Sequence, residues 1–493
     1  MKPGIFQQLT LYRYRYMVGY ILVALFSISM LTWQLTTLGP GLADAEKASA
    51  VHSAMWQMHN WKEAGLQVVN LPYVLLQKTS IAALGLSVLS VRLPSVIIGL
   101  GTGALFFLLM RLLHKSHVAL SASLLFAAGA WYIGIARFGA PYIMIPFVWT
   151  LVAYSLVRLI RLDEPPLAWA ALGGLASALA LYTPYGIYAL VVAGVVVAVH
   201  PKIRRNLTAL NGPQVVLGLF MLVPLLIPLG WGLFKDYHQL WDLAALSPHI
   251  PNPADFIRNI GTTIWALGGR APLLPELRLG NLPIISLGTS AILLAGVYRS
   301  VRDWRSMRAQ FTFISILVLL VVIGLNPANK DDSVLILPMF MLVASGVTVL
   351  FHEWYRLFPR NPYARSFGLI PIVIFLGFIL SFNYQRYFVA WANTPSTYRV
   401  YDNDLTLARK QMAAHPNLVL IVPDTQLAFY KVAARAYPKV TVGDATTIQQ
   451  PDQTILLASS IVPPVPTPVR PLQPIVNDDT DNSLRFWLVT PVQ

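Results

Sequence analysis

GLADAEKASAVHSAMWQMHNWKEAGLQVVNLPY, residues 41–73, is the stretch around which the chain is organised. It directly follows the first apolar segment and holds Asp44, Glu46 and Glu63 in a chain of which only 12% is charged. From Val51 onward, apolar residues recur every three or four positions, which predicts an amphipathic helix on a membrane surface. Asp44 and Glu46 are therefore expected at the start of that helix, beside the mouth of the membrane region.

The composition indicates an integral membrane protein. Of the 493 residues, 56% are hydrophobic, which is more than a soluble domain carries. The net charge of +15 would suggest nucleic acid in a soluble protein, but most basic residues here lie in short segments between apolar stretches. No nucleic-acid partner is expected. The chain has no cysteine, which excludes disulfides, thiolate metal sites and cysteine nucleophiles.

Apolar stretches of roughly the ~20 residues needed to cross a bilayer recur along the chain. They lie near 17–38, 93–110, 118–136, 141–157, 167–182, 185–199, 214–233, 282–298, 310–325, 333–351 and 367–383. The sequence therefore predicts a polytopic α-helical protein with about eleven transmembrane helices. The first stretch is interpreted as an uncleaved anchor; a cleavable signal peptide with a poor processing site at 42–45 is the alternative.

The loops between these stretches alternate in charge. Basic residues gather in the leader and in the segments 111–115, 158–161, 202–205, 299–308 and 356–365, which are expected to be cytoplasmic because positive loops stay inside. The less basic loops hold most of the carboxylates and are expected to face outward. Two of them, 39–91 and 234–281, are long. The N-terminus is then cytoplasmic and the C-terminus extracytoplasmic.

The pattern changes after Phe382. A strand-like segment at 417–423 and a helix-like segment at 425–437 precede further short strand-like runs, as in a soluble α/β domain. We therefore expect a membrane domain at 1–384 and a small extracytoplasmic α/β domain at 385–493.

Asp44 and Glu46 are the candidate catalytic bases, because they are the only closely spaced acidic pair of the first outer loop. The structural alternative is that Asp44 caps the following helix and Glu46 complements its dipole. Their place at the membrane mouth, just after the first span, favours a catalytic role for at least one of them.

Three cations near the outer face are candidate binding residues. Arg137 ends the third span, where a charge costs about 2.5–3.5 kcal/mol unless it meets a partner or snorkels to the interface. Arg92 and Lys78 allow the same interpretations. In the second long outer loop, His249 and Arg270 are weaker candidates, and no metal-ligand spacing occurs there, so no metal site is expected.

Four segments carry a resemblance to a known family. They are ADAEKASA at 43–50, the segment 71–113 with VRLPS at 91–95, GAWYIGIARFGAPYIMIPF at 129–147, and ALGGLASALALYTPYGIYAL at 171–190. Their order resembles glycosyltransferase family 39, the protein O-mannosyltransferase and aminoarabinose transferase type of membrane glycosyltransferase with a GT-C fold. VRLPS is the most specific of the four.

The resemblance implies a membrane enzyme that transfers a sugar from a polyprenyl-phosphate donor to a hydroxyl of a lipid, glycan or protein on the outer face, with inversion. Asp44 or Glu46 would be the base, and Arg137 with Lys78 or Arg92 would bind the donor phosphate. No cofactor is implied, and the sequence leaves a divalent metal open.

Two departures from the family pattern keep alternatives open. Ala45 stands where the catalytic aspartate belongs, and Tyr142 stands where a second aspartate belongs. Either Asp44 has taken the role, or Glu46 serves, or the protein is an inactive membrane scaffold. A transporter or flippase of lipid-linked glycans is the main alternative function.

Overall fold

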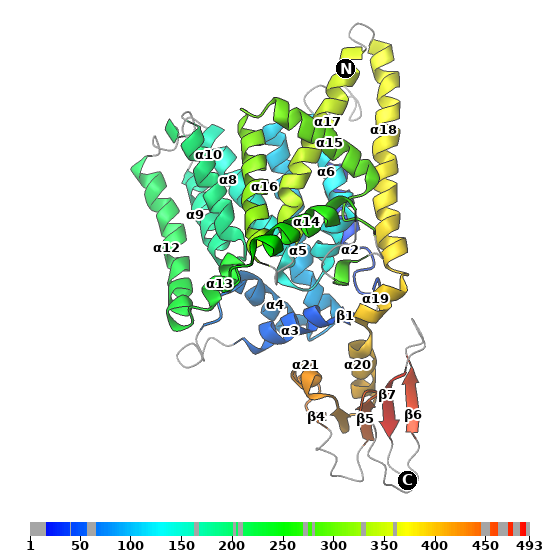
Figure 1. The fold of residues 1–493 in the computed structure, drawn as a ribbon. Helices are drawn as coiled ribbons and strands as arrows, with labels where there is room; N and C mark the ends of the chain where they lie inside the picture. The colour runs from blue at the N-terminus through cyan, green and yellow to red at the C-terminus, as the bar shows by residue number, and fades with distance from the viewer. Residues whose placement is uncertain are drawn as a thin grey trace, which may run out of the picture.

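The computed structural model describes most of the chain. The described residues are 16–39, 41–56, 66–161, 167–200, 204–205, 211–269, 275–278, 282–326, 332–357, 362–444, 454–461, 472–476 and 484–489. Within them, long helices form a bundle, and strands gather near the C-terminus beyond one end of it (Figure 1).

The bundle helices coincide with the predicted apolar stretches. They are α2 (Met17–Thr32), α5 (Val88–Leu113), α6 (Ser116–Ala128), α7 (Ala130–Arg137), α8 (Met144–Arg161), α9 (Leu167–Tyr182), α10 (Gly186–Val199), α12 (Gly212–Lys235), α15 (Leu287–Arg302), α16 (Met307–Leu325), α17 (Ile336–Leu357) and α18 (Pro362–Tyr384). One predicted stretch, 118–136, falls on the pair α6 and α7, which are bent by 58° at their junction. The helical character of the fold is confirmed.

Helix length and composition give a smaller number of membrane crossings than the predicted eleven. Among the described residues, six helices are long and apolar enough to cross a membrane, or seven when α6 and α7 count as one span. The helices α2, α9, α10 and α15 have 14 to 16 residues. At 1.5 Å per residue these fall short of the ~30 Å hydrocarbon core. The count of about eleven therefore stays a prediction.

Burial separates the centre of the bundle from its edge. In the most apolar part of α17, 83% is buried inside the protein, and in that of the segment containing α8, 78% is buried. In α12 the buried share is 11%, because this helix packs mainly along α9 and leaves most of its apolar side chains on the outside. A helix that is apolar all round but packed on one side is suited to a lipid environment.

Short helices lie at the end of the bundle that faces the sheet. They are α3 (Asp44–Met55), α4 (Leu71–Leu84), α13 (Gln239–Ala244), the 3-10 turn η3 (Pro275–Leu277) and α19 (Pro395–Val400). The helix α14 (Pro253–Gly268) lies across the bundle and packs on α16 (Figure 1). The helix expected to start at Asp44 and Glu46 is α3, which begins at Asp44 as predicted and ends at Met55, since Trp56 is not helical. Glu63 lies outside the described residues.

The C-terminal strands form a mixed sheet of order β4-β3-β5-β7-β6. The strands are β3 (Leu418–Ile421), β4 (Thr441–Gly443), β5 (Thr454–Ala458), β6 (Leu472–Val476) and β7 (Leu484–Val489). The helix α20 (Asp404–Ala414) precedes β3, and α21 (Asp424–Ala434) connects β3 to β4. β3 is parallel to β4 and β5, whereas β7 is antiparallel to β5 and β6. The expected strand at 417–423 is β3, and the expected helix at 425–437 is α21.

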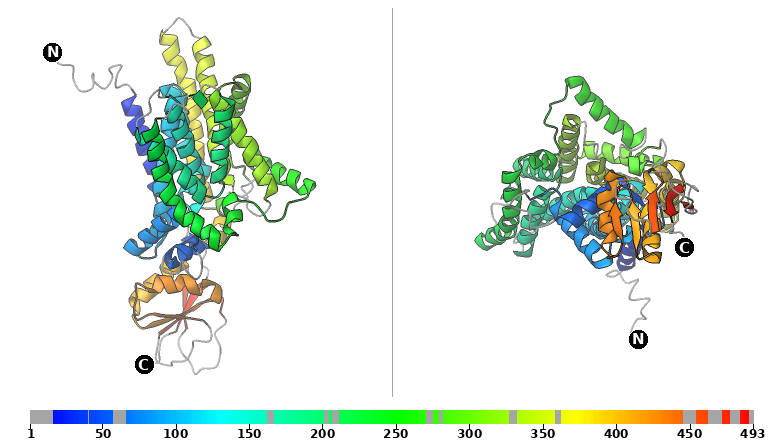
Figure 2. Two further views of the ribbon diagram at one scale, coloured as in Figure 1. Left: turned by 90° about the vertical axis from the view of Figure 1, so that its left-hand side faces the viewer. Right: turned by 90° about the horizontal axis from the view of Figure 1, so that it is seen from below.

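A strand pair and an apolar cluster are among the contacts that join the C-terminal part to the bundle. The strand β1 (Leu42–Ala43) pairs with β2 (Tyr401–Asp402), which brings the start of α3 against the chain that enters the sheet. One apolar cluster also includes Ala50 of α3 and Ile81 of α4 together with Phe429 of α21 and strand residues. The views in Figure 2 show the sheet below the bundle, on the side of α3 and α4.

Candidate functional site

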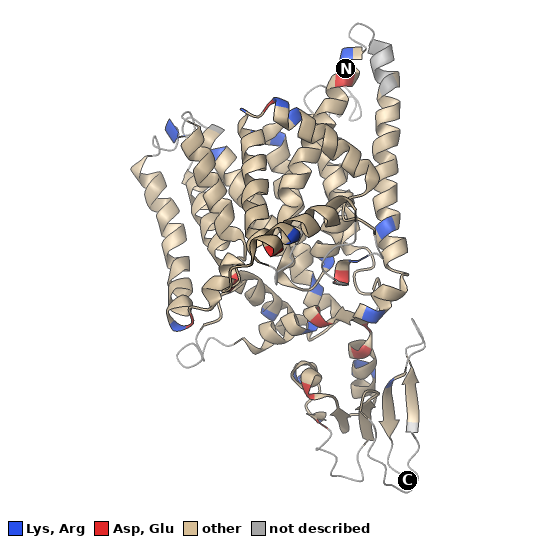
Figure 3. Ribbon diagram, viewed as in Figure 1, with Lys and Arg blue, Asp and Glu red and all other residues tan. Residues whose placement is uncertain are grey.

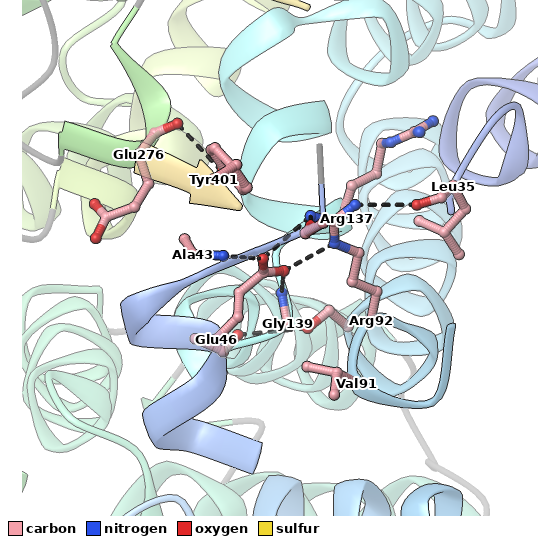
Figure 4. A network of polar contacts seen from close by, with 12 residues as sticks. Leu35, Ala43, Glu46, Val91, Arg92, Arg137, Gly139, Glu276 and Tyr401 are labelled. Atoms are coloured by element: carbon pink, nitrogen blue, oxygen red, sulfur yellow. Dashed lines mark hydrogen bonds and ion pairs between the residues drawn. The ribbon is translucent and has the colours of Figure 1, made fainter. Parts of the chain in front are cut away.

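A buried ion pair lies at the junction of α3 and α5. Glu46 is 0% exposed and Arg92 is 4% exposed. Arg92 Nε donates to Glu46 Oε1 at 2.9 Å, and Arg92 Nη2 donates to Glu46 Oε2 at 3.1 Å, so the pair is bidentate (Figure 4). The parallel fork of N–H groups on one carboxylate is the strongest form of side-chain ion pair.

The other hydrogen bonds of Glu46 and Arg92 are made with backbone groups. Glu46 also accepts from Ala43 N at 3.0 Å and from Gly139 N at 2.7 Å. The guanidinium of Arg92 also donates to three carbonyls, those of Leu35 at 3.1 Å, Leu38 at 3.4 Å and Gly41 at 2.7 Å. All five N–H groups of Arg92 are therefore used within the protein, and none is left for a phosphate.

Two glycines allow these backbones to approach the ion pair. Gly41 has a φ of +78°, and a Cβ there would lie 1.7 Å from the carbonyl oxygen of Asp402, so only glycine fits where β1 meets β2. A Cβ on Gly139 would lie 2.5 Å from Val91 Cγ1 and 3.0 Å from Glu46 Oε1. The segment after α7 can therefore deliver its N–H to Glu46 only because residue 139 has no side chain.

Arg137, at the end of α7, fastens the C-terminal end of α2. It is 3% exposed and donates to the carbonyls of Met30 at 3.1 Å, Trp33 at 2.6 Å and Gln34 at 3.0 Å. Its guanidinium also lies 5.6 Å from the ring centroid of Tyr387. A cation at helix carbonyls left without an intrahelical partner is favourable. In this structure Arg137 braces α2 and does not open into a described cavity.

Asp44 differs from Glu46 although only one residue separates them. The structure places Ala43 at the N-cap, so Asp44 is the first helical residue of α3 and not its cap. Its side chain is 94% exposed and lies 3.6 Å from Lys47 Nζ. Lys47 itself is buried and pairs with Asp402 of β2. Of the predicted acidic pair, Asp44 alone presents free carboxylate oxygens to solvent.

The other predicted residues lie apart from this network. Lys78 donates to the carbonyl of Trp56, at the C-terminal end of α3. Because α3 has 12 residues, Lys78 Nζ and Asp44 are separated by about 18 Å along the helix. His249 is exposed, and its backbone N–H bonds to Ser247 Oγ at 3.3 Å. Arg270 lies outside the described residues.

Glu276 was not singled out from the sequence, and the structure brings it to the edge of the network. Its carbonyl accepts from Tyr401 Oη and from Trp391 Nε1, both at 3.3 Å. Its carboxylate oxygen Oε2 is buried without a hydrogen-bond partner among the described residues. A buried unpaired carboxylate needs an explanation. Only its place on the long second outer loop marked it in the sequence.

Tyr401 links these groups. Its ring centroid lies 5.8 Å from the guanidinium carbon of Arg92, and its hydroxyl donates to Glu276. Burial, followed by the charge of Glu46, raises the pKa of Tyr401 well above its ordinary value. The phenol is therefore a neutral donor that connects α5, η3 and β2. Among the described residues, no group of three or more His, Asp or Glu side chains could hold a metal ion.

A family model that matches part of the chain, and solved structures with a similar fold, support the resemblance expected from the sequence. The family model described as dolichyl-phosphate-mannose-protein mannosyltransferase matches residues 72–231. No curated protein matches the sequence.

Several solved structures share the fold along most of the chain. ArnT from Cupriavidus metallidurans in the apo state has 12% sequence identity and a TM-score of 0.57, covering 96% of this chain and 97% of that one. The same protein bound to undecaprenyl phosphate has 13% identity, a TM-score of 0.57 and the same coverage. The oligosaccharyltransferase AglB from Archaeoglobus fulgidus, in complex with an inhibitory peptide and a dolichol-phosphate, has 13% identity and a TM-score of 0.52, covering 87% and 64%. The chain is a membrane protein with this fold.

Proposed function

We propose that the protein transfers a sugar from a polyprenyl-phosphate donor to a hydroxyl acceptor. The reaction takes place on the side of the membrane that carries α3 and the C-terminal sheet, which is the extracytoplasmic side if the basic loops are cytoplasmic. The match of the mannosyltransferase family model and the shared fold of a protein that binds undecaprenyl phosphate support this donor class.

Asp44 is proposed as the general base. The observation that carries this assignment is the contrast within the acidic pair. Glu46 is fully buried with each oxygen accepting two hydrogen bonds, whereas the Asp44 carboxylate is 94% exposed at the start of the same helix. A base must reach the proton that it removes, and Asp44 meets that requirement. Glu46 is proposed to position Asp44 by fixing the first turn of α3.

In the reaction, Asp44 takes the proton of the acceptor hydroxyl while that oxygen attacks the anomeric carbon. The bond from this carbon to the phosphate oxygen breaks, and the lipid phosphate leaves with the bonding electron pair. Attack opposite the leaving group inverts the anomeric centre.

The test compares purified variants in proteoliposomes that hold native membrane extract as acceptor source. The probes are undecaprenyl-phosphate-linked hexoses and pentoses with radiolabelled sugar, and the readout is released undecaprenyl phosphate. Asp44→Asn is expected to lower transfer by about 10² to 10⁴-fold, which is the usual contribution of a general base. Its melting temperature should stay at the wild-type value, because Asp44 is exposed.

Asp255→Asn is the matched control, since Asp255 is a half-buried carboxylate of the second long outer loop that pairs with Arg258 at 2.8 Å. It should retain wild-type transfer. Full transfer by Asp44→Asn would overturn the assignment of the base, and loss of transfer in Glu276→Gln with a normal melting temperature would move it to Glu276. Movement of the donor across the bilayer without any release of undecaprenyl phosphate would replace the transferase by a flippase.

A further inference from the structure

A hollow lies at the opposite end of the bundle from α3 and the sheet. Its volume is about 990 Å³, and it lies among the ends of α5, α6, α15, α16 and α17. Figure 3 shows Lys and Arg on helix ends at this end of the bundle. By the positive-inside rule this is the cytoplasmic end.

Four cations line this hollow, and no carboxylate is among its described lining residues. The cations are Arg111, Lys115, Arg299 and Arg308. The nearest carboxylate is Asp303, which lies 3.4 Å from Arg299 Nη2 and 3.2 Å from Arg308 Nη2. One carboxylate thus serves two guanidinium groups, and the hollow keeps a net positive charge.

Two of the four cations, Arg299 and Lys115, have N–H groups without an acceptor among the described residues. Arg299 Nε is buried without a hydrogen-bond partner among the described residues. Lys115 makes no ion pair within the described part of the chain, and it is the N-cap of α6, whose first N–H groups receive no side-chain cap. Unpaired donors in a concave site, together with a helix N-terminus, favour an anion.

His114 also lines this hollow, and its pKa is lowered by the same arginines. Its ring lies on the wall of the hollow, and Nδ1 is 3.0 Å from Thr348 Oγ1 of α17. Burial, followed by the guanidinium groups of Arg308 and Arg299, lowers the pKa of His114 to about 3. The histidine is therefore neutral at physiological pH, and the two arginines act on it as positive charge despite Asp303.

The orientation of the chain in the membrane does not by itself explain why four cations surround a hollow. The positive-inside rule requires cations in the loop but not around a hollow. Arg302 and Arg305 satisfy that rule in the same segment, because both are exposed and neither lines the cavity. Arg299 and Arg308, on the same two helices and loop, turn toward the hollow instead. From the sequence, these arginines were expected only to orient the chain in the membrane.

We propose that this cavity binds a phosphate-bearing anion at the membrane surface opposite the transfer site. A basic pocket between transmembrane helices on the cytoplasmic side fits the headgroup of an anionic phospholipid. A free phosphate or pyrophosphate offers the same chemistry to the four cations, and the test separates the two sources. The inference does not depend on the proposed transfer reaction.

The experiment measures the melting temperature of the full-length protein in neutral detergent after removal of lipid. Separate samples receive phosphatidylglycerol, phosphatidylcholine or sodium pyrophosphate at constant ionic strength. Binding to the folded state raises the melting temperature, on the order of 2 °C or more well above the dissociation constant. Phosphatidylglycerol is expected to raise it, and phosphatidylcholine is not.

Arg111→Gln with Lys115→Gln is the test variant, because it removes two lining cations and leaves both arginine pairs of Asp303 intact. Arg302→Gln with Arg305→Gln is the matched control with the same loss of charge at the same end of the bundle. The shift should disappear in the first variant and persist in the second. A response to pyrophosphate with the same pattern would identify a soluble anion as the ligand. An equal loss in both variants, or no shift with any anion in the wild type, would overturn the proposal.

Discussion

The two ends of the bundle treat charge in opposite ways. At the end near the sheet, Arg92 and Glu46 are buried together, and every N–H group of the arginine has an acceptor. At the other end, Arg299 and Arg308 share one carboxylate beside a hollow of about 990 Å³. The first arrangement is closed, whereas the second retains unused donors.

A charged residue near a membrane mouth is therefore not by itself a ligand site. A buried charge whose hydrogen bonds all end within the protein holds helices together. A charge is available to substrate only where its donors or acceptors remain open, as for the Asp44 carboxylate and the Arg299 guanidinium. Substitutions at each end of the bundle test this difference between closed and open charges.

The largest effect is expected when the closed pair is broken. Glu46→Gln removes the charge that compensates Arg92 in a site where both side chains are almost fully buried. Breaking a buried pair on one side costs about 3–5 kcal/mol, because the remaining charge is left without compensation. The variant should give little folded protein, with a large fall in the midpoint of unfolding measured in detergent.

Asp255→Asn provides the matched comparison on a more exposed pair. Arg258 and Asp255 are 72% and 38% exposed, and such pairs contribute little because solvent screens them. Its unfolding midpoint should stay close to that of the wild type. Replacing both members of the buried pair, as Glu46→Leu with Arg92→Met, should recover part of the loss. Equal midpoints for Glu46→Gln and Asp255→Asn would show that the buried pair is not what holds α3 to α5.

A smaller effect is expected for the link between the bundle and the sheet. Lys47 is buried, and its ammonium group pairs with Asp402 of β2, directly beside the antiparallel contact of β1 and β2. A hydrogen bond to a charged group contributes about 1.5–3 kcal/mol. Lys47→Met should therefore loosen the start of the C-terminal part, and limited proteolysis should cleave the chain faster near residues 393–403.

Lys431→Met serves as the control for this change, since Lys431 lies on an exposed turn of α21 and makes no ion pair in the described part of the chain. Its cleavage rate should match the wild type. If Lys47→Met is cut no faster than the control, the ion pair does not fasten the sheet to the bundle.

The elements of the fold were predictable because their signals are local. An apolar stretch and its length are visible in a run of residues, so the positions of α5, α8, α16 and α17 followed from the sequence. The start of a helix near Asp44 was also expected. The predicted N-cap was one residue late, because Glu46 bonds back to the N–H of Ala43 and moves the cap there.

The partners within the site could not be read from the sequence. Arg92 and Glu46 are 46 residues apart, and the pairing also needs the N–H of Gly139, 93 residues from Glu46. No periodicity encodes a contact between three separate helices. The same holds for Glu276, which Tyr401 fixes from far along the chain. The cations that line the hollow were visible in the sequence only as an excess of basic residues in the loops, because their convergence depends on where five helices end.

The smallest predicted effect is a pH-dependent loss of stability caused by His114, which lines the hollow. His114 faces Arg308 on α16, Arg299 on α15, the Thr348 hydroxyl on α17, and Arg111 and Lys115 near its own helix end, with Asp303 as the nearby carboxylate. Its pKa of about 3 in the folded protein lies below the ordinary value of 6.5. The unfolded chain therefore takes up a proton below pH 6.5 that the folded chain refuses, so stability is present above pH 6.5 and falls as the pH falls toward 3. The loss from this residue should reach up to about 2 kcal/mol at pH 5.

His114→Gln should remove this part of the pH dependence and keep a hydrogen bond to Thr348. The measurement is the unfolding midpoint of the wild type and the variant at pH 7.5 and pH 5, because the difference between the two proteins cancels the titration of all other groups. His249→Gln, at an exposed position outside the hollow, should show the wild-type dependence. If His114→Gln loses as much stability between the two pH values as the wild type, the arginines and the burial of this hollow do not keep the histidine neutral. An anion bound in the hollow would shield the arginines from His114, so phosphatidylglycerol should raise the pKa and reduce the loss in the wild type but not in Arg111→Gln with Lys115→Gln.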